Sequence, residues 1–248
     1  MKLLSKVFIC LFIVGLLLTG LQVRKIAQAT GQVDYAAQLF QRLRPDAGFK
    51  ILFMGDSTAV GVGSPAPAAS TAGWFGKDFP EASIENISQS GLRLAGLREK
   101  LNLVHGDHYD LIVLQIGAND IMHMTTFGNI DSDVRAILEF CRSKSDHIAI
   151  LHSGNIGTAP IFIWPFSWIL SERSYYVREI YKRAAHDNRA VYVDLIDYGV
   201  DKLCIDHPEK YYATDHLHLS GEGYRVWYGA IRASLAKAGV QFESPVLK

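Results

Sequence analysis

The sequence predicts an α/β fold in which a parallel β-sheet is covered by helices on both faces. Short, continuous apolar runs alternate along the chain with longer segments of helical periodicity. Strands that are buried on both faces appear as such unbroken runs, and the alternation is typical of βαβ units. The chain has 248 residues, 49% of them hydrophobic, which is enough for one domain with a sizeable core.

The strongest strand pattern is residues 110–116, whose central letters are Leu-Ile-Val-Leu. The predicted strands are residues 50–54, 83–87, 110–116, 147–151 and 190–194. Apolar residues at helical spacing predict helices within 74–79, 92–104, 130–142, 171–186 and 221–238. In open sheets of this kind, ligands bind beyond the carboxyl ends of the strands, and we therefore expect the chemistry at that edge.

The N-terminus predicts a membrane-anchor or signal helix over residues 1–29. Residues 7–23 are uncharged and, as a helix, would be roughly 25 Å long. Arg24 and Lys25 follow directly, which favours a retained anchor, whereas the Ala-Gln-Ala at 27–29 resembles a signal-peptidase site. A buried core helix is a third alternative.

Either membrane interpretation implies export. A retained anchor would leave the folded domain outside the cytoplasm, whereas cleavage near Ala29 would give a secreted or periplasmic protein. The predicted organisation is a membrane segment (1–29), a polar, helix-compatible connector (30–47), the main α/β domain (48–240) and a C-terminal tail (241–248). In the connector, Tyr35, Leu39 and Leu43 recur every four residues.

Charge and cysteine content exclude several classes of protein. Basic and acidic residues balance at 25 each, and no basic run stands out, which argues against a nucleic-acid partner. The spacing of Cys10, Cys141 and Cys204 matches neither a zinc pattern nor a disulfide framework. Two isolated buried thiols at 141 and 204 are favoured over a disulfide between them.

A candidate nucleophile follows the first predicted strand. Gly55 allows a sharp exit from that strand, and Ser57 would then lie above the sheet edge. A serine hydroxyl needs a base to remove its proton, and Gly-Asp-Ser alone is more often an ordinary turn or helix cap. Gly91 and Asn119 follow the second and third strands, where a bare backbone N–H and a side-chain amide are suited to hold an oxyanion.

The candidate base lies near the C-terminus, before the last helix. Asp215 and His218 are three residues apart, so one turn of chain can aim both side chains the same way. An aspartate that accepts from one imidazole nitrogen leaves the other nitrogen free as a base. The alternative is a metal site formed by Asp215, His216 and His218, to which Asp206 and His207 could add, but only clustering supports it.

In these positions the chain resembles the SGNH/GDSL hydrolase family. The four family blocks correspond to residues 55–57, Gly91, residues 117–120 and residues 215–218. The resemblance spans roughly residues 50–235 and implies a three-layer αβα, flavodoxin-like fold with a five-stranded parallel sheet, esterase or lipase activity, and no cofactor or metal. Thr58 and Leu219 depart from the leucine and proline that many members carry there.

The resemblance also implies a role for each residue. Ser57 would be the nucleophile, His218 the base and Asp215 the group that orients it. The backbone N–H groups of Ser57 and Gly91 and the amide of Asn119 would form the oxyanion hole.

An aromatic insertion after the fourth strand bears on the substrate. Residues 161–170 are nearly uncharged and include Phe162, Trp164, Phe166 and Trp168. They are candidates to line an acyl groove or to contact a bilayer, although a flap that packs onto the domain is an equally good interpretation. With the N-terminal helix, they favour a lipid or acyl-chain ester as substrate. The alternatives are an O-acetyl esterase acting on an envelope polysaccharide and a non-catalytic, membrane-tethered binding module.

Overall fold

The computed structural model describes residues 2–29, 33, 38–240 and 242, and it contains one five-stranded parallel sheet. The strands are β1 (Lys50–Gly55), β2 (Ser83–Asn86), β3 (Leu111–Gln115), β4 (Ile148–Leu151) and β5 (Val191–Tyr192). Their spatial order is β2-β1-β3-β4-β5, which is the doubly wound, flavodoxin-like order. The predicted fold class is therefore confirmed.

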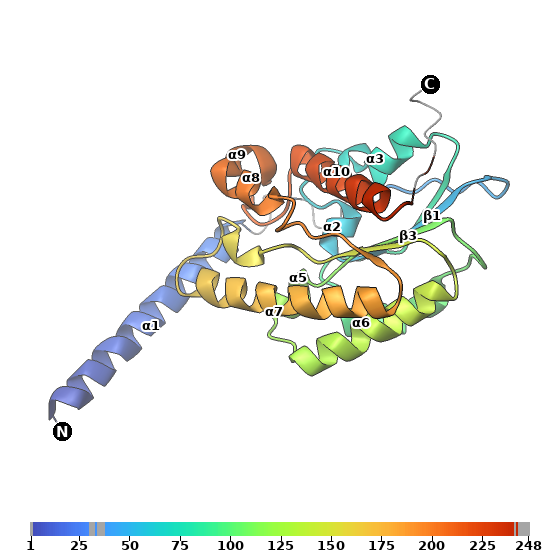
Figure 1. Cartoon of the computed structure of the whole chain (residues 1–248). Coiled ribbons are helices and arrows are strands. Elements are labelled where there is room, and N and C mark those ends of the chain that lie inside the picture. Colours follow the sequence, from blue (N-terminus) through green and yellow to red (C-terminus); the bar gives the residue numbers. More distant parts are fainter. Residues whose placement is uncertain (1, 30–32, 34–37, 241, 243–248) are drawn as a thin grey trace.

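Helices cover both faces of the sheet and form three layers (Figure 1). One face carries α3 (Thr71–Asp78), α8 (Val200–Asp206), α9 (Pro208–Tyr211) and α10 (Gly221–Lys237). The opposite face carries α4 (Leu94–Glu99), α6 (Phe127–Arg142) and α7 (Phe166–Asp187). Two short helices, α2 (Ser57–Val60) and α5 (Ala118–Met122), follow β1 and β3, and 3₁₀ turns occupy Pro67–Ala69, Leu101–Leu103 and Ile156–Thr158.

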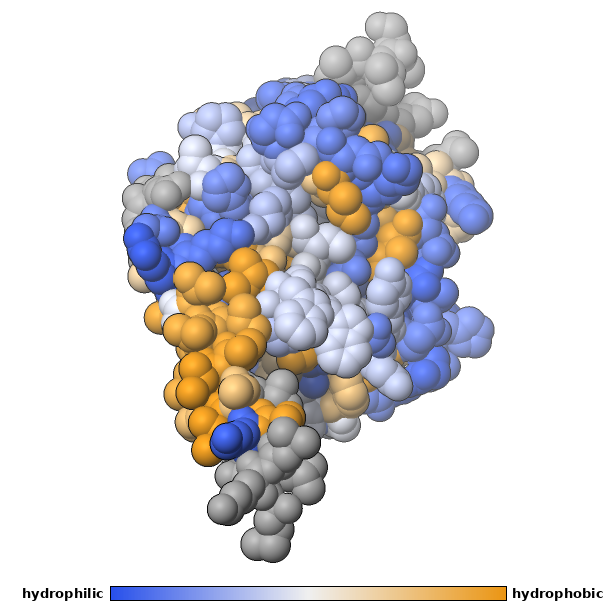
Figure 2. Space-filling view, turned by 90° about the vertical axis from the view of Figure 1, so that its left-hand side faces the viewer, coloured by the Kyte–Doolittle hydropathy of each residue, from blue (hydrophilic) through white to orange (hydrophobic). Residues whose placement is uncertain are grey.

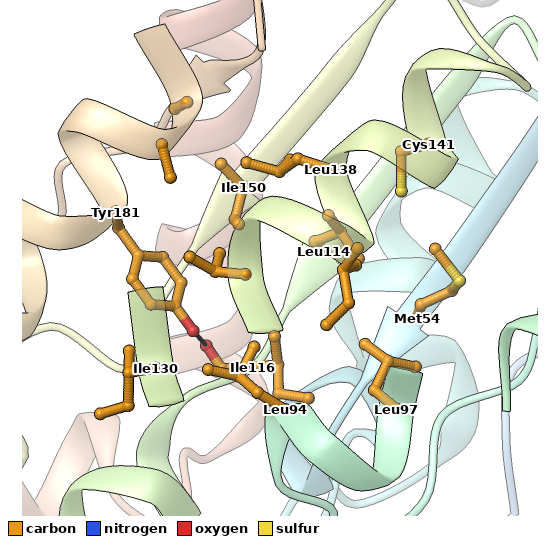
Figure 3. Close-up of a cluster of buried hydrophobic side chains, with 14 of the residues drawn as sticks. Met54, Leu94, Leu97, Leu114, Ile116, Ile130, Leu138, Cys141, Ile150 and Tyr181 are labelled. Atoms are coloured by element: carbon orange, nitrogen blue, oxygen red, sulfur yellow. Dashed lines mark hydrogen bonds between the residues drawn. The ribbon is translucent and has the colours of Figure 1, made fainter. Parts of the chain in front are cut away.

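The unbroken apolar runs are explained by two cores, one on each face of the sheet. Along β1, Leu52 and Met54 enter the core under α4, α6 and α7, while Ile51 and Phe53 enter the core under α3 and α10. Alternate side chains of a strand point to opposite faces, and here both faces are buried. Figure 3 shows the first core, in which the Tyr181 hydroxyl donates to the Ile116 carbonyl at 2.9 Å.

Several elements differ from the sequence expectation. The helix expected over 92–104 divides into α4 and a 3₁₀ turn, although Leu94, Leu97 and Leu101 still face one core. Helix α7 begins at Phe166, so much of the aromatic insertion is helical. Helices α8 and α9 were not expected, because seven and four residues are too few to carry a helical period.

The described part of the connector is not helical. Arg42 and Ile84 exchange backbone hydrogen bonds of 2.9 and 2.7 Å, which closes the free edge of β2. The Arg42 guanidinium also donates to the carbonyls of Gly76, Phe79 and Ala82. Tyr35 lies outside the described residues. The boundary expected at residue 48 stays a prediction, since Phe40, ahead of that boundary, already packs against the core of the domain.

Helix α1 (Lys2–Ala29) includes the apolar N-terminal run and projects away from the sheet (Figure 1). Among the described residues it is the one helix that is long and apolar enough to cross a membrane, over Phe12–Ala29. A signal sequence has the same length and composition, so α1 is a candidate anchor.

The two cysteines of the catalytic domain lie in different cores. Cys141 of α6 and Cys204 of α8 are buried on opposite faces of the sheet, and both thiols are free. The interpretation of two isolated thiols agrees with this placement.

Candidate active site

Ser57 is the first residue of α2, directly beyond the carboxyl end of β1. A side chain at Gly55 would place its Cβ 1.9 Å from the Gln115 carbonyl oxygen of β3, so only glycine fits at this exit. Asp56 caps α2, and its Oδ1 accepts from the Thr58 N–H at 2.9 Å and from the Thr58 hydroxyl at 2.8 Å. Thr58, a departure from the family pattern, therefore strengthens this cap.

Ser57, His218 and Asp215 are joined by hydrogen bonds. The Ser57 Oγ lies 2.9 Å from His218 Nε2, and His218 Nδ1 lies 2.6 Å from Asp215 Oδ2. The serine and the histidine are 161 positions apart in the chain, and the sheet topology brings them together. This is the geometry in which an imidazole can take a proton from a serine hydroxyl.

The aspartate is held by the turn that it shares with the histidine. Asp215 is fully buried, and its Oδ1 accepts from the N–H groups of Leu217 and His218, both at 3.0 Å. Burial opposes ionisation, but the hydrogen bonds from the His218 ring and from these backbone groups prevail and lower the pKa of Asp215. A carboxylate is thus present beside the imidazole at neutral pH.

His216 lies on the outside of the same turn. It adopts a φ of +59° and is exposed, while Asp215 and His218 on either side are buried. His216 therefore lies at the rim of the turn, away from the hydrogen bond between Asp215 and His218.

Hydrogen bonds join the loop after β2 to the end of β1 and to the loop after β3. The Gln89 N–H donates to the Gly55 carbonyl at 3.0 Å, and the Asn119 amide donates to the Leu92 carbonyl at 3.1 Å. Asp120 braces the same loop by accepting from the Leu94 N–H at 2.9 Å. These bonds gather Gly91 and Asn119 at the edge of the sheet that carries Ser57.

The backbone N–H groups of Ser57 and Gly91 donate to no other group within the part of the chain that the structure describes. Gly91 adopts a φ of +77°, and a Cβ there would meet no atom within 4 Å. Glycine is therefore favoured at this position by the backbone conformation, and open space lies above it. These two N–H groups are thus available to bind an anion, and the Asn119 NH₂, which gives one hydrogen to Leu92, has a second one.

Gly63 and Tyr224 pack against the turn of residues 215–218, which we call the catalytic turn. The sequence analysis missed both residues. A Cβ on Gly63 would lie 2.6 Å from the Leu219 carbonyl oxygen and 3.0 Å from the His218 Cβ, and φ at Gly63 is +88°. The Tyr224 hydroxyl donates to the Val62 carbonyl at 2.7 Å. The Gly-Val-Gly sequence at residues 61–63 could have indicated that another segment packs closely here.

The four aromatic residues of the insertion divide into two pairs. Phe162 and Phe166 are half-buried, and Phe162, like Leu217, packs against the core. Trp164 and Trp168 are 68% and 59% exposed. The insertion therefore packs inward in part and presents two indoles outward.

Two cavities border the catalytic turn. One of about 640 Å³ is lined by Gly63, Ser64, Pro65, Tyr212 and Thr214, among others. A small one of about 40 Å³ lies against Thr58, Leu217 and His218. Neither is lined by Trp164 or Trp168.

Metal coordination was the alternative use of the histidine cluster. In the chain as far as it is described, no three His, Cys, Asp or Glu side chains are grouped to hold a metal ion. Both ring nitrogens of His218 are engaged by Ser57 and Asp215, and Asp206 pairs with Lys202 at 2.6 Å.

His152 ends β4 at the same edge but is enclosed by aromatic rings. It is buried, with ring centroids 5.5 Å from Tyr181 and 6.0 Å from Tyr192. Burial lowers the pKa of His152 to about 4. The side chain is therefore a neutral core group at working pH.

We expect His152 to make the fold sensitive to acid. The His152 imidazole of the unfolded chain has a pKa of about 6.5, so below that pH it binds a proton that it does not bind in the folded chain. The free energy of unfolding should fall by about 2 kcal/mol between pH 7.5 and pH 5 from this group. Urea denaturation of wild type and His152→Phe at both pH values measures the difference. An equally steep pH dependence in the two proteins would contradict the assignment.

The chain was compared with family models, with curated proteins and with solved structures. The model of the GDSL-like lipase/acylhydrolase family matches residues 53–226. No curated protein matches the chain. Among solved structures, TesA superposes with a TM-score of 0.62 at 15% identity, covering 76% of this chain and 98% of TesA.

Two further structures are similar at this level. LAE5, an α/β hydrolase enzyme from the metagenome of Lake Arreo, gives a TM-score of 0.61 at 18% identity over 79% of this chain and 98% of its own. A variant of an acetyl xylan esterase from Geobacillus stearothermophilus gives 0.55 at 18% identity over 79% and 97%. At these identities the structural matches establish a shared fold.

Proposed function

The chain belongs to the GDSL-like lipase/acylhydrolase family and is a carboxylic-ester hydrolase, and we propose that Ser57 is its nucleophile, His218 its general base and Asp215 the residue that orients the base. The observation that carries this proposal is the continuous hydrogen-bonded path from Ser57 Oγ through the imidazole to the Asp215 carboxylate.

The reaction proceeds by acyl transfer in two steps. His218 takes the Ser57 proton as Oγ attacks the ester carbonyl, and the imidazolium then gives that proton to the departing alcohol. In the second step the same imidazole takes a proton from the water that attacks the acyl carbonyl, and the imidazolium returns this proton to Ser57 Oγ as the acid leaves. The ionised Asp215 stabilises the imidazolium in both steps and keeps the tautomer whose Nε2 is free to accept.

The oxyanion is held by the backbone N–H groups of Ser57 and Gly91 and by the amide of Asn119. The absence of competing acceptors for the two backbone groups, within the described residues, supports this assignment. Loss of one such donor typically lowers the rate by about 10²–10³.

The substrate is an ester of a long acyl chain. The support is the uncharged insertion beside the catalytic turn: Phe162 and Leu217 pack on the same small apolar cluster, and Trp164 and Trp168 face outward. Such a surface suits an apolar substrate better than a sugar, whose hydroxyl groups need polar partners.

The protein is exported and stays attached to the membrane through α1, with its catalytic domain outside the cytoplasm. The side chain of Ala29, where a signal peptidase would cut, is 6% exposed and packs on Ala159 and Ile161. This packing gives α1 a place in the folded protein, which favours retention over cleavage.

The acyl-chain preference tests the substrate class. With full-length protein in detergent, kcat/KM for p-nitrophenyl esters should rise by about fourfold for each CH₂ that enters the apolar site, because burial of one CH₂ gains about 0.8 kcal/mol. Trp164→Ala and Trp168→Ala should raise KM for long-chain esters more than for acetate. Tyr198→Ala, which removes an exposed aromatic ring elsewhere, is the matched control. Equal effects on acetate and long-chain esters would make the insertion a structural flap and would favour sugar O-acetyl esters.

A further inference from the structure

The end of α1 is fixed to the catalytic domain by one buried side chain. Gln22 is only 5% exposed, although most of its neighbours on this helix are exposed. Its amide Nε2 donates to the Ile161 carbonyl at 3.2 Å, and its Oε1 accepts from the Ile163 N–H at 2.9 Å. We call these two bonds the Gln22 clamp. They set the position and the rotation of the helix at this point.

Two further contacts extend the docked region to the end of the helix. The Lys25 ammonium donates to the Pro160 carbonyl, and Ala29 packs with Ala159 and Ile161. The last two turns of α1 therefore lie on the segment 159–163, and Figure 1 shows the helix meeting the domain beside the start of α7. Such a helix is part of the domain and not a flexible tether.

Before the clamp, α1 leaves the domain and exposes apolar side chains. Those at least 49% exposed include Phe12, Ile13, Val14, Leu16, Leu17, Leu21 and Val23. Figure 2 shows the helix as a hydrophobic column against a mostly hydrophilic body. The apolar run ends at Val23, and Arg24 follows, so the edge of a bilayer crossed by α1 falls at the level of the clamp.

The clamp brings the two outward indoles to that same level. Trp164 directly follows Ile163, and adjacent Cα atoms are about 3.8 Å apart. Trp168 lies in the first turn of α7, and both side chains are more than half exposed. Tryptophan prefers the interface between lipid and water, because its ring is apolar and its N–H needs a polar partner.

The clamped segment also reaches the catalytic turn. The Ile161 N–H donates to the His216 carbonyl at 3.1 Å, between Asp215 and His218. We propose that the Gln22 clamp fixes the catalytic domain on the bilayer that α1 spans, with Trp164 and Trp168 in the interfacial layer, so that Ser57 acts on esters presented by that bilayer. The substrate rests on the proposed function, whereas the orientation rests on α1 and the clamp.

Tryptophan quenching tests the orientation without any use of activity. The full chain is reconstituted in phosphatidylcholine–phosphatidylglycerol vesicles with brominated phosphatidylcholine. Wild-type fluorescence should be quenched, and Trp164→Phe/Trp168→Phe should lose most of the quenchable part. Trp74→Phe is the matched control, because Trp74 stacks on Tyr228 over α3 and α10, and it should keep the quenching.

The clamp itself is tested by Gln22→Ala. Thr19→Ala is the matched control, because the Thr19 hydroxyl bonds only to the Gly15 carbonyl of the same helix. Gln22→Ala should stay in the membrane but lose at least half of the Trp164 and Trp168 quenching. Its hydrolysis of a long-chain ester in the same vesicle should fall roughly tenfold, as expected when positioning is lost. Soluble p-nitrophenyl acetate should be hydrolysed within about twofold of wild type, because the bond from Ile161 to His216 remains.

The proposal would be overturned if wild-type Trp164 and Trp168 were not quenched, if Gln22→Ala and wild type were quenched equally, or if Gln22→Ala lost equal activity on the vesicle and soluble esters. A mature N-terminus at Thr30 would overturn it as well. The proposed function would fail separately, if Ser57→Ala hydrolysed soluble esters at the wild-type rate. The quenching result does not depend on that outcome.

Discussion

Replacement of Ser57 by alanine is expected to lower ester hydrolysis by several orders of magnitude and to leave the fold intact. Alanine has no hydroxyl oxygen to form the acyl-enzyme. A water molecule in the same place would not be held in line with the ester carbonyl as the Ser57 oxygen is. The Ser57 Oγ contacts His218 at the start of α2, where alanine is tolerated and the cap from Asp56 remains. The measurement is kcat/KM for a soluble ester, with circular dichroism and thermal unfolding to show that the fold is retained.

Ser88→Ala is the matched control for this substitution. Ser88 is also buried, follows β2, and within the described structure its hydroxyl has no hydrogen-bond partner. It should keep wild-type turnover. Wild-type turnover in Ser57→Ala, or an equal loss in both variants, would contradict the role of Ser57.

Asp215→Asn is expected to lower kcat by about 10⁴ with little change in structure. The asparagine oxygen can still accept from the N–H groups of Leu217 and His218, as Asp215 Oδ1 does. Its NH₂ group would then face His218 Nδ1 in place of the carboxylate oxygen at 2.6 Å. The imidazole would have to accept at Nδ1 and carry its proton on Nε2, where it cannot take the Ser57 proton.

The control for the aspartate is Asp206→Asn, which removes a charge from an exposed carboxylate of α8 paired with Lys202. It should have nearly wild-type kcat. A loss of less than about tenfold in Asp215→Asn would show that the carboxylate does not set the tautomer of the base.

The sheet could be predicted from the sequence because its signal is local. The central strands β1, β3 and β4 are buried on both faces and appear as nearly unbroken apolar runs, whereas the edge strand β2 alternates between buried and half-buried residues. The turn from Asp215 to His218 is also local, and a spacing of three residues was enough to propose it. The meeting of Ser57 and His218 is not local: the rule that ligands bind at the carboxyl edge, together with the family resemblance, suggested it, and their roles stay predictions.

Other contacts left no trace that the sequence alone could reveal. Gln22 is a single polar residue in an apolar run, and its partner Ile161 is 139 positions away. Gly63 appears as an ordinary turn glycine until the His218 turn is placed against it. The short helices α8 and α9 pack on each other and on α10, and neither is long enough to show periodicity in the sequence.

The most direct test of the central claim is covalent labelling by a fluorophosphonate, which reacts with a serine only when a base has activated it. We expect one adduct per chain, located by peptide mass spectrometry on Ser57, absent in Ser57→Ala and strongly slowed in Asp215→Asn. Ester hydrolysis that continues without labelling, or an adduct on a different serine, would contradict the account.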